Sequence, residues 1–188
     1  MRYLYALIGL LVMLAATAAA VSSNVILDAD TYVDANNANQ SFSDSDTLWA
    51  ASADEKPIKE VYLSFRNDFG TTNVFKSEAI KSATLNLTAI QIENPGEIKA
   101  YLVEGATLEI TWLTKPEYDS SVSAALNVEE NGSYTLDVTP LIKKAVETCI
   151  EDCPYSIVLV AEDGASVGFA SSEASEKNKP SLKYITSN

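Results

Sequence analysis

The sequence predicts an all-β fold, a two-sheet antiparallel β-sandwich of the jelly-roll kind with one short α-helix. Three observations predict it: short runs in which apolar and polar residues alternate, turn-forming clusters between these runs, and a length of 188 residues. Alternation with period two gives one face of a strand to a core and the other to solvent. Several such runs in succession suit two packed antiparallel sheets.

The first twenty residues have the composition of a secretory signal peptide. Arg2 supplies a basic start, residues 3–17 are almost wholly apolar, and residues 18–20 are alanines that suit a signal peptidase. A retained anchor is the alternative, because the apolar run is just long enough to cross a bilayer. We expect cleavage after Ala20, which leaves residues 21–188 as one domain.

The strands of this domain are expected where apolar residues alternate with polar ones. The two clearest runs are residues 60–65 and 83–89, whose apolar members are Val61, Leu63 and Phe65, and Ala83, Leu85, Leu87 and Ala89. Other strands are expected at residues 25–34, 47–51, 98–103, 133–138, 156–161, 167–171 and 181–186.

One helix is expected between two of these strands. Thr139 has the side chain of an N-cap, and Pro140 suits the first helical position, where its missing N–H costs nothing. An apolar stripe follows, formed by Leu141, Ile142, Ala145 and Val146. We expect this helix to close one end of the sandwich.

The negative net charge and the lack of histidine argue against several classes of function. The chain has 26 acidic and 13 basic residues, a net charge of −13, which disfavours binding to nucleic acid or to anionic lipids. Membrane contact is expected only through an uncleaved N-terminal segment. Without histidine there is no Ser/His/Asp triad, no Cys/His pair and no histidine-bearing zinc site. Hydrolysis by two carboxylates stays open, but no pair stands out, and we expect no enzyme activity.

The two cysteines, Cys149 and Cys153, lie four residues apart before a predicted strand. In an exported protein this spacing favours a local disulfide, with free thiols as the alternative.

Residues 34–46 form a polar segment rich in Asn, Asp and Ser. One interpretation is a surface turn, because these side chains bond their own backbone. The other is a calcium site, because Asp28 with Asp30, or Asp44 with Asp46, places two carboxylates at i and i+2.

Six blocks in order carry a resemblance to a known family. These blocks are residues 28–33, 61–65, 81–87, 111–116, 136–139 and 169–173. In this order they resemble the DNRLRE (disaggregatase-related) family, β-sandwich modules of secreted and cell-surface proteins that are related to carbohydrate-binding modules. Arg66 and Tyr134 depart from the pattern, where an acidic residue and a tryptophan are common. The resemblance implies carbohydrate binding and a structural calcium between the first and last strands, held by Asp28, Asp30 and Glu173.

Carbohydrate sites usually offer aromatic faces to sugar rings and polar groups to their hydroxyls. The candidates are Trp49, Tyr118 and Tyr62, and Trp49 stands out because it follows the acidic segment at the start of a predicted strand. Packing in or beside the core is the alternative for each ring, as it is for Trp112 and Tyr101.

Three sequons could carry N-linked glycans in an exported chain, at Asn39, Asn86 and Asn131, with chance occurrence as the alternative. The pair Asn131-Gly132 also predicts a tight hairpin turn.

These observations predict an exported, non-catalytic module that binds extracellular or cell-wall polysaccharide. The main alternative is a structural subunit of an extracellular filament, sheath or coat that self-assembles by strand addition. A polysaccharide hydrolase or lyase is the third possibility.

Overall fold

The computed structural model describes residues 20–105, 109–148, 154–175 and 177–187. Eleven strands and one α-helix make up this part of the chain, and none of its helices has the length and apolar character needed to span a membrane. The strands are β1 (Ala20–Val25), β2 (Leu27–Asp34), β3 (Thr47–Ala53), β4 (Lys56–Phe65), β5 (Ile80–Asn94), β6 (Gly96–Glu104), β7 (Asp119–Val128), β8 (Gly132–Asp137), β9 (Tyr155–Ala161), β10 (Ser166–Ala170) and β11 (Ser181–Ser187). The helix α1 spans Thr139–Thr148, and two short 3₁₀ turns, η1 and η2, span Ala35–Asn37 and Ser77–Ala79.

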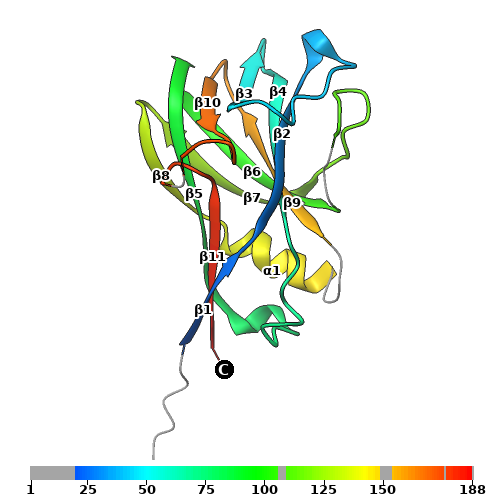
Figure 1. Cartoon of the computed structure of the whole chain (residues 1–188), viewed down its shortest axis with the longest axis vertical. Coiled ribbons are helices and arrows are strands. Elements are labelled where there is room, and N and C mark those ends of the chain that lie inside the picture. The colour runs from blue at the N-terminus through cyan, green and yellow to red at the C-terminus, as the bar shows by residue number, and fades with distance from the viewer. Residues whose placement is uncertain (1–19, 106–108, 149–153, 176, 188) are drawn as a thin grey trace, which may run out of the picture.

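The strands form a curled, wholly antiparallel sheet that folds over into a sandwich (Figure 1). One layer, here the first sheet, has the order β1-β11-β5-β10-β3, and β8 pairs with the other edge of β5. The second sheet has the order β2-β4-β9-β6-β7. The two are joined where β3 turns into β4 at Asp54 and Glu55, both in the left-handed region that type I′ hairpins use. The predicted β-sandwich with one short helix is confirmed.

The core lies between the two sheets and follows from the alternation in the sequence. Along β5, the side chains of Ala83, Leu85, Leu87 and Ala89 are buried, while Thr84, Asn86 and Thr88 lie on the outer face. Strand β9 is buried along its whole length. Its outer face is covered as well, by Ile110, Trp112 and Tyr118 of the segment between β6 and β7. Each sheet therefore presents a different kind of outer surface.

Two strands were not predicted. Strand β7 consists mainly of small residues, and its alternation of Val122, Ala124 and Leu126 with polar or small neighbours is weak. Strand β1 is short, has only three apolar residues among its six and is mostly exposed, so its formation depends on pairing with β11. The single strand predicted at 25–34 is in fact divided at Ile26, whose side chain is exposed.

The helix packs over one end of the core, as predicted, but its first turn is built differently from the prediction. Leu141, Ile142, Ala145 and Val146 are buried, and α1 contacts β5, β6 and β7. The Thr139 hydroxyl accepts a hydrogen bond from the Ala83 amide at 2.9 Å rather than capping a helical N–H. The Asp137 carboxylate instead accepts the Thr139 amide at 2.9 Å, and these bonds to Thr139 lower the pKa of Asp137.

The turn at Asn131 and Gly132 is also different from the prediction. Strand β7 pairs with β6 and β8 pairs with β5, so the turn carries the chain from the second sheet to the first. It is therefore a connection between layers rather than the loop of a hairpin.

Truncation of the helix should destabilise the fold. Ile142→Ala removes a fully buried side chain, and we expect the free energy of unfolding to fall by about 2–5 kcal/mol. Lys143→Ala, on the partly exposed side of the same helix, is the matched control, with an expected change within about 0.5 kcal/mol. Urea denaturation of both variants measures the difference, and equal losses would show that α1 does not support the core.

Candidate functional site

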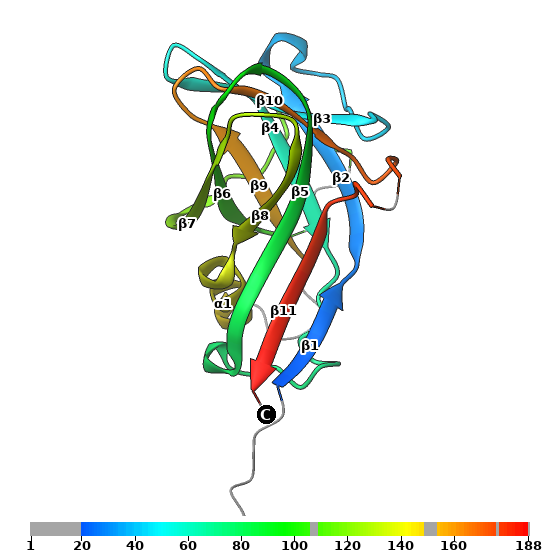
Figure 2. The same ribbon diagram turned by 90° about the vertical axis from the view of Figure 1, so that its left-hand side faces the viewer.

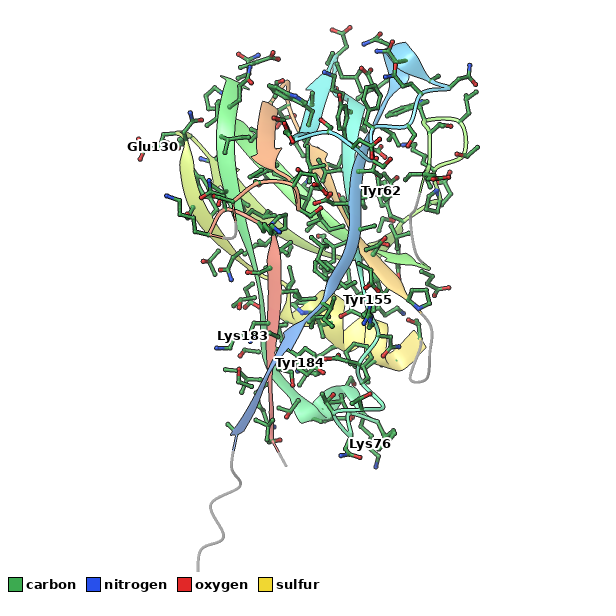
Figure 3. All side chains as sticks on the ribbon, in the orientation of Figure 1. Tyr62, Lys76, Glu130, Tyr155, Lys183 and Tyr184 are labelled. Atoms are coloured by element: carbon green, nitrogen blue, oxygen red, sulfur yellow. The ribbon has the colours of Figure 1, made fainter. Side chains whose placement is uncertain are left out.

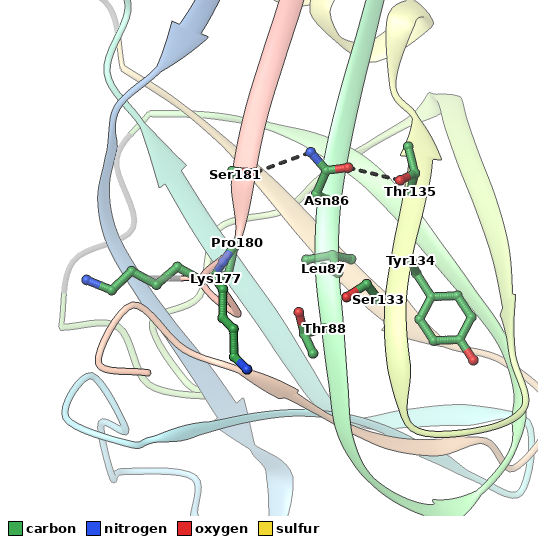
Figure 4. A pocket seen from close by; sticks show the side chains of 10 residues that line it. Asn86, Leu87, Thr88, Ser133, Tyr134, Thr135, Lys177, Pro180 and Ser181 are labelled. Carbon is green, nitrogen blue, oxygen red and sulfur yellow. Dashed lines mark hydrogen bonds between the residues drawn. The ribbon is translucent and has the colours of Figure 1, made fainter. Parts of the chain in front are cut away.

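A polar groove of about 440 Å³ crosses the outer face of the first sheet (Figure 4). Strands β5, β8 and β11 form its floor, and the segment before β11 forms one wall. The lining residues are Asn86, Leu87, Thr88, Ser133, Tyr134, Thr135, Lys177, Lys179, Pro180 and Ser181. A concave site of this size falls within the range of small-molecule pockets in proteins.

The polar side chains of the groove are fixed in place by strand register. Asn86 lies opposite Thr135 on one side and Ser181 on the other. The Thr135 hydroxyl donates to Asn86 Oδ1 at 2.9 Å, and Asn86 Nδ2 donates to the Ser181 hydroxyl at 3.3 Å (Figure 4). This row of hydroxyl and amide groups extends across three strands. It can exchange hydrogen bonds with a ligand that is itself rich in hydroxyls.

Tyr134 lines the groove but does not offer its ring to it. Its partner in the ladder is Leu87, which points into the core, so the ring leans the same way. The Tyr134 hydroxyl donates to the Glu130 carbonyl at 2.7 Å and accepts the Glu129 and Glu130 amides. Figure 4 shows the ring directed away from Ser181. Tyr134 therefore holds the turn between β7 and β8.

Trp49 lies further along the same outer face. Its neighbours Leu48 and Ala50 are buried in the core, so the alternation of β3 directs Trp49 outward, where it is half-buried. Its partner on β10 is Gly168, which in turn pairs with Gln91 on β5. The ladder thus places Trp49 on the same face as Gln91, which lies on β5 three residues beyond Thr88 of the groove.

Gly168 makes room for the indole of Trp49. A Cβ atom at this position would lie 3.3 Å from Cζ2 of Trp49 and 2.8 Å from Cγ2 of Thr47. On another side, Lys59 Nζ lies 5.3 Å from the centroid of the Trp49 ring, within cation–π range. Both neighbours orient the ring, and neither was predicted as part of a site, because only the strand pairing brings them to Trp49.

The other two predicted aromatic residues lie on the second sheet. Tyr62 is fully buried, so its ring has no face for a sugar, and the prediction for this residue is wrong. Its hydroxyl donates to Glu60 Oε2 at 2.9 Å, and burial together with the Glu60 charge raises the pKa of Tyr62. Tyr118 is half-buried and stacks on Tyr101 with ring centroids 4.6 Å apart. The two rings cover each other.

The segment that contains Tyr118 is fastened to the second sheet by a buried ion pair. Lys115 Nζ lies 2.5 Å from Oε1 of Glu60, whose side chain is only 1% exposed. The same ammonium lies 4.0 Å from the centroid of the Trp112 ring. A buried carboxylate needs such partners, because an unpaired charge in the interior is costly. The aromatic residues here therefore belong to packing, and the groove face remains the candidate site.

Two of the aspartates predicted to bind calcium have protein partners in this structure. Asp30 is buried, and its carboxylate accepts the Ser172 amide at 2.6 Å and the Ser172 hydroxyl at 3.0 Å. Asp28 pairs with Arg66 at 2.6 Å, while Asp44 and Asp46 are exposed. Within the described residues, no three acidic, cysteine or histidine side chains are grouped as a metal site.

Asp30 nevertheless joins the two sheets through its contact with Ser172. It lies on β2 of the second sheet, and Ser172 follows β10 of the first. Burial raises the pKa of Asp30, the bonds from Ser172 oppose this, and the nearby charge of Glu173 adds to it. Calcium binding by Asp28, Asp30, Glu173, Asp44 or Asp46 stays a prediction.

The remaining predicted residues fall in different settings. Asn39 is exposed in the segment after η1, and Asn131 is exposed in the turn before β8. Asn86 lies in the groove, where its amide nitrogen is already hydrogen-bonded. Cys149, Cys153 and the predicted signal peptide up to residue 19 lie outside the described residues.

Comparison with known families now identifies the class of module. The model of carbohydrate-binding module family 96 matches residues 21–186, nearly the whole chain, and the chain belongs to this family. No curated protein matches the sequence significantly. The predicted relation to carbohydrate-binding modules is confirmed at this level, and the narrower DNRLRE resemblance stays a prediction.

The contact between Asp30 and Ser172 gives a prediction for stability. Asp30→Ala removes both hydrogen bonds between Asp30 and Ser172, and we expect the free energy of unfolding to fall by about 1–3 kcal/mol. Asp44→Ala, at an exposed position, is the control, with little expected change. Equal stability of the two variants would contradict a role for Asp30 in joining the sheets.

The raised pKa of Asp30 predicts the sign of a pH effect. Because the folded state holds the proton more tightly than the unfolded chain, the contribution of Asp30 is most favourable below its ordinary value of 3.8 and is lost as pH rises through the folded pKa. The Asp30→Asn variant has no such titration. Its free energy of unfolding, relative to that of the wild type, should therefore increase as pH rises from below 3.8 through the folded pKa of Asp30. Denaturation curves at several pH values measure the difference, and a constant or decreasing difference would contradict the shift.

Proposed function

We propose that this chain binds an extracellular polysaccharide on the outer face of its first sheet, with Trp49 as the stacking platform and the groove as the site for sugar hydroxyls. The observation that carries the proposal is the placement of a half-buried tryptophan beside Gly168, on the same face as a row of outward polar side chains. Membership of a carbohydrate-binding module family supports the class of ligand.

The groove has the chemistry that a sugar chain needs. Hydroxyl and amide groups both donate and accept hydrogen bonds, as sugar hydroxyls do, and they come from Asn86, Thr88, Ser133, Thr135 and Ser181. The indole of Trp49 offers an apolar surface to the C–H groups on the face of a pyranose ring. The combination suits a chain that lies along the sheet.

Two lysines give the groove a local charge that differs from that of the whole molecule. Lys177 and Lys179 line one wall, although the chain as a whole carries a net charge of −13. Lysines beside a row of hydroxyls can also donate hydrogen bonds to sugar oxygens. We propose binding without chemical change of the ligand, by a protein exported through its N-terminal segment.

Loss of the tryptophan should weaken binding. For Trp49→Ala we expect about a tenfold or larger loss of affinity for the polysaccharide, because the stacking surface is removed. Phe75→Ala is the matched control, since Phe75 is an exposed aromatic residue beside η2. Its neighbour Lys76 is labelled at the lower end of the molecule in Figure 3, whereas β3, the strand of Trp49, lies at the upper end in Figure 1. Affinity electrophoresis through gels containing a panel of polysaccharides measures retention. Equal retention of both variants would remove Trp49 from the site.

The floor of the groove can be tested separately. Asn86→Ala breaks the bonds to Thr135 and Ser181 and removes an amide from the groove, and we expect about a tenfold weaker affinity. Asn127→Ala changes an exposed asparagine on β7, in the second sheet, and should bind normally. Calorimetric titration with oligosaccharides compares them. Normal binding by the Asn86 variant would place the ligand elsewhere.

A further inference from the structure

Strand β1 is an open edge of the first sheet. It pairs with β11 along all six of its residues, from Ala20 opposite Ser187 to Val25 opposite Leu182. No strand in the described part of the chain pairs with its other side. Figure 2 shows β1 at the margin of the sheet, beside β11, with β5 and β8 beyond it. The amide and carbonyl groups on this outer side are available for another strand.

This edge lacks the features that usually prevent strands from pairing. All six residues of β1 are uncharged, none is proline, and its ladder with β11 has no bulge. By contrast, the free edge of β2 carries three aspartates and a register shift. Val21 on β1 and Ile26 just after it are among the few large apolar side chains that are exposed, at 41% and 53%. β1 has no charged residue, whereas the edge strands β7 and β8 have one aspartate each, in a chain of net charge −13.

We propose that two copies of this chain pair through their β1 strands, antiparallel and related by a two-fold axis. The same six-residue edge is presented by both copies, so the interface is self-complementary. Because β1 carries no charged side chain, pairing along this strand brings no like-charged side chains of β1 face to face. Cleavage after Ala20 would remove the first residue of the edge and leave the α-ammonium of Val21 at its end, so that five uncharged side chains remain on the strand.

The pairing has a consequence for ligand binding, and this step rests on the function proposed above. Antiparallel pairing within one sheet requires the axis to run perpendicular to the sheet, so the outer faces of both copies lie on the same side. Ser181 of the groove lies on β11, the strand next to β1. Two grooves would then face one polysaccharide surface, and simultaneous binding would raise the apparent affinity for a polymer over that for a short oligosaccharide.

The oligomeric state tests the proposal without any sugar. We expect the full chain, purified as cells export it, to sediment as a concentration-dependent dimer. Ser22→Lys places two like charges close together across the two-fold axis, and we expect at least a tenfold weaker dimer, with part of the loss recovered at high salt. Ser123→Lys, at an exposed position on the free edge of β7, should dimerise as wild type.

A second variant with the opposite charge at Ser22 shows whether the loss of the dimer comes from charge repulsion or from misfolding. Ser22→Glu alone should also dimerise poorly, and mixing it with Ser22→Lys should restore a dimer, which excludes misfolding as the cause. A monomeric wild-type chain, or a Ser22→Lys variant that dimerises normally, would overturn the proposal, as would a dimer that only Ser123→Lys disrupts. Larger polymers of the wild type would overturn it in favour of open-ended assembly.

Sugar binding then separates the two proposals. Ser22→Lys should keep the wild-type affinity for a short oligosaccharide and lose about tenfold or more of its retention on the polymer. If the dimer forms but no carbohydrate binds, the ligand proposal fails and the β1 pairing stands. If oligosaccharide binds but the wild type is monomeric, the pairing fails and the ligand proposal stands.

Discussion

The structure depends on strand β5, which pairs along both of its edges and carries apolar residues on one face and polar residues on the other. This strand of fifteen residues pairs with β11 and β10 along one edge and with β8 along the other. Its inward residues, Ala83 to Ala89, supply the core, and each outward residue between them lies in or beside the groove. A shift of one residue in register would exchange these faces, burying the hydroxyls and exposing the leucines. The same ladder that stabilises the core therefore arranges the groove.

Asp30 on β2 joins the two sheets through its hydrogen bonds with Ser172. A calcium ion joining the first and last strands was implied by family resemblance, and Asp30 does lie between the layers. Here its carboxylate accepts two hydrogen bonds from Ser172, which are short and charge-assisted. The same aspartate position thus connects the sheets through direct hydrogen bonds.

The sequence allowed the fold class and most strands to be predicted, because alternation directly reports which face is buried. It predicted Trp49 from its residue type and position, but Gly168 is distant in sequence and Lys59 lies on the next strand, and only the strand pairing brings them to the ring. The groove was missed because threonine, serine and asparagine on a solvent face are common in any sheet. Tyr62 was predicted wrongly, because the segment around Lys115 covers a face that alternation alone leaves in solvent.

The chain has two tryptophans, which allows the central claim to be tested by fluorescence. Trp112→Phe leaves Trp49 as the only tryptophan, and Trp49→Phe leaves only Trp112, which packs against Lys115 on the second sheet. Titration of both variants with a polysaccharide that the wild type binds should change the emission of Trp49, because a sugar ring would exclude water from its exposed face. The emission of Trp112 should stay constant. A saturable change in Trp112 emission with none in Trp49 would contradict the account and place the ligand on the second sheet.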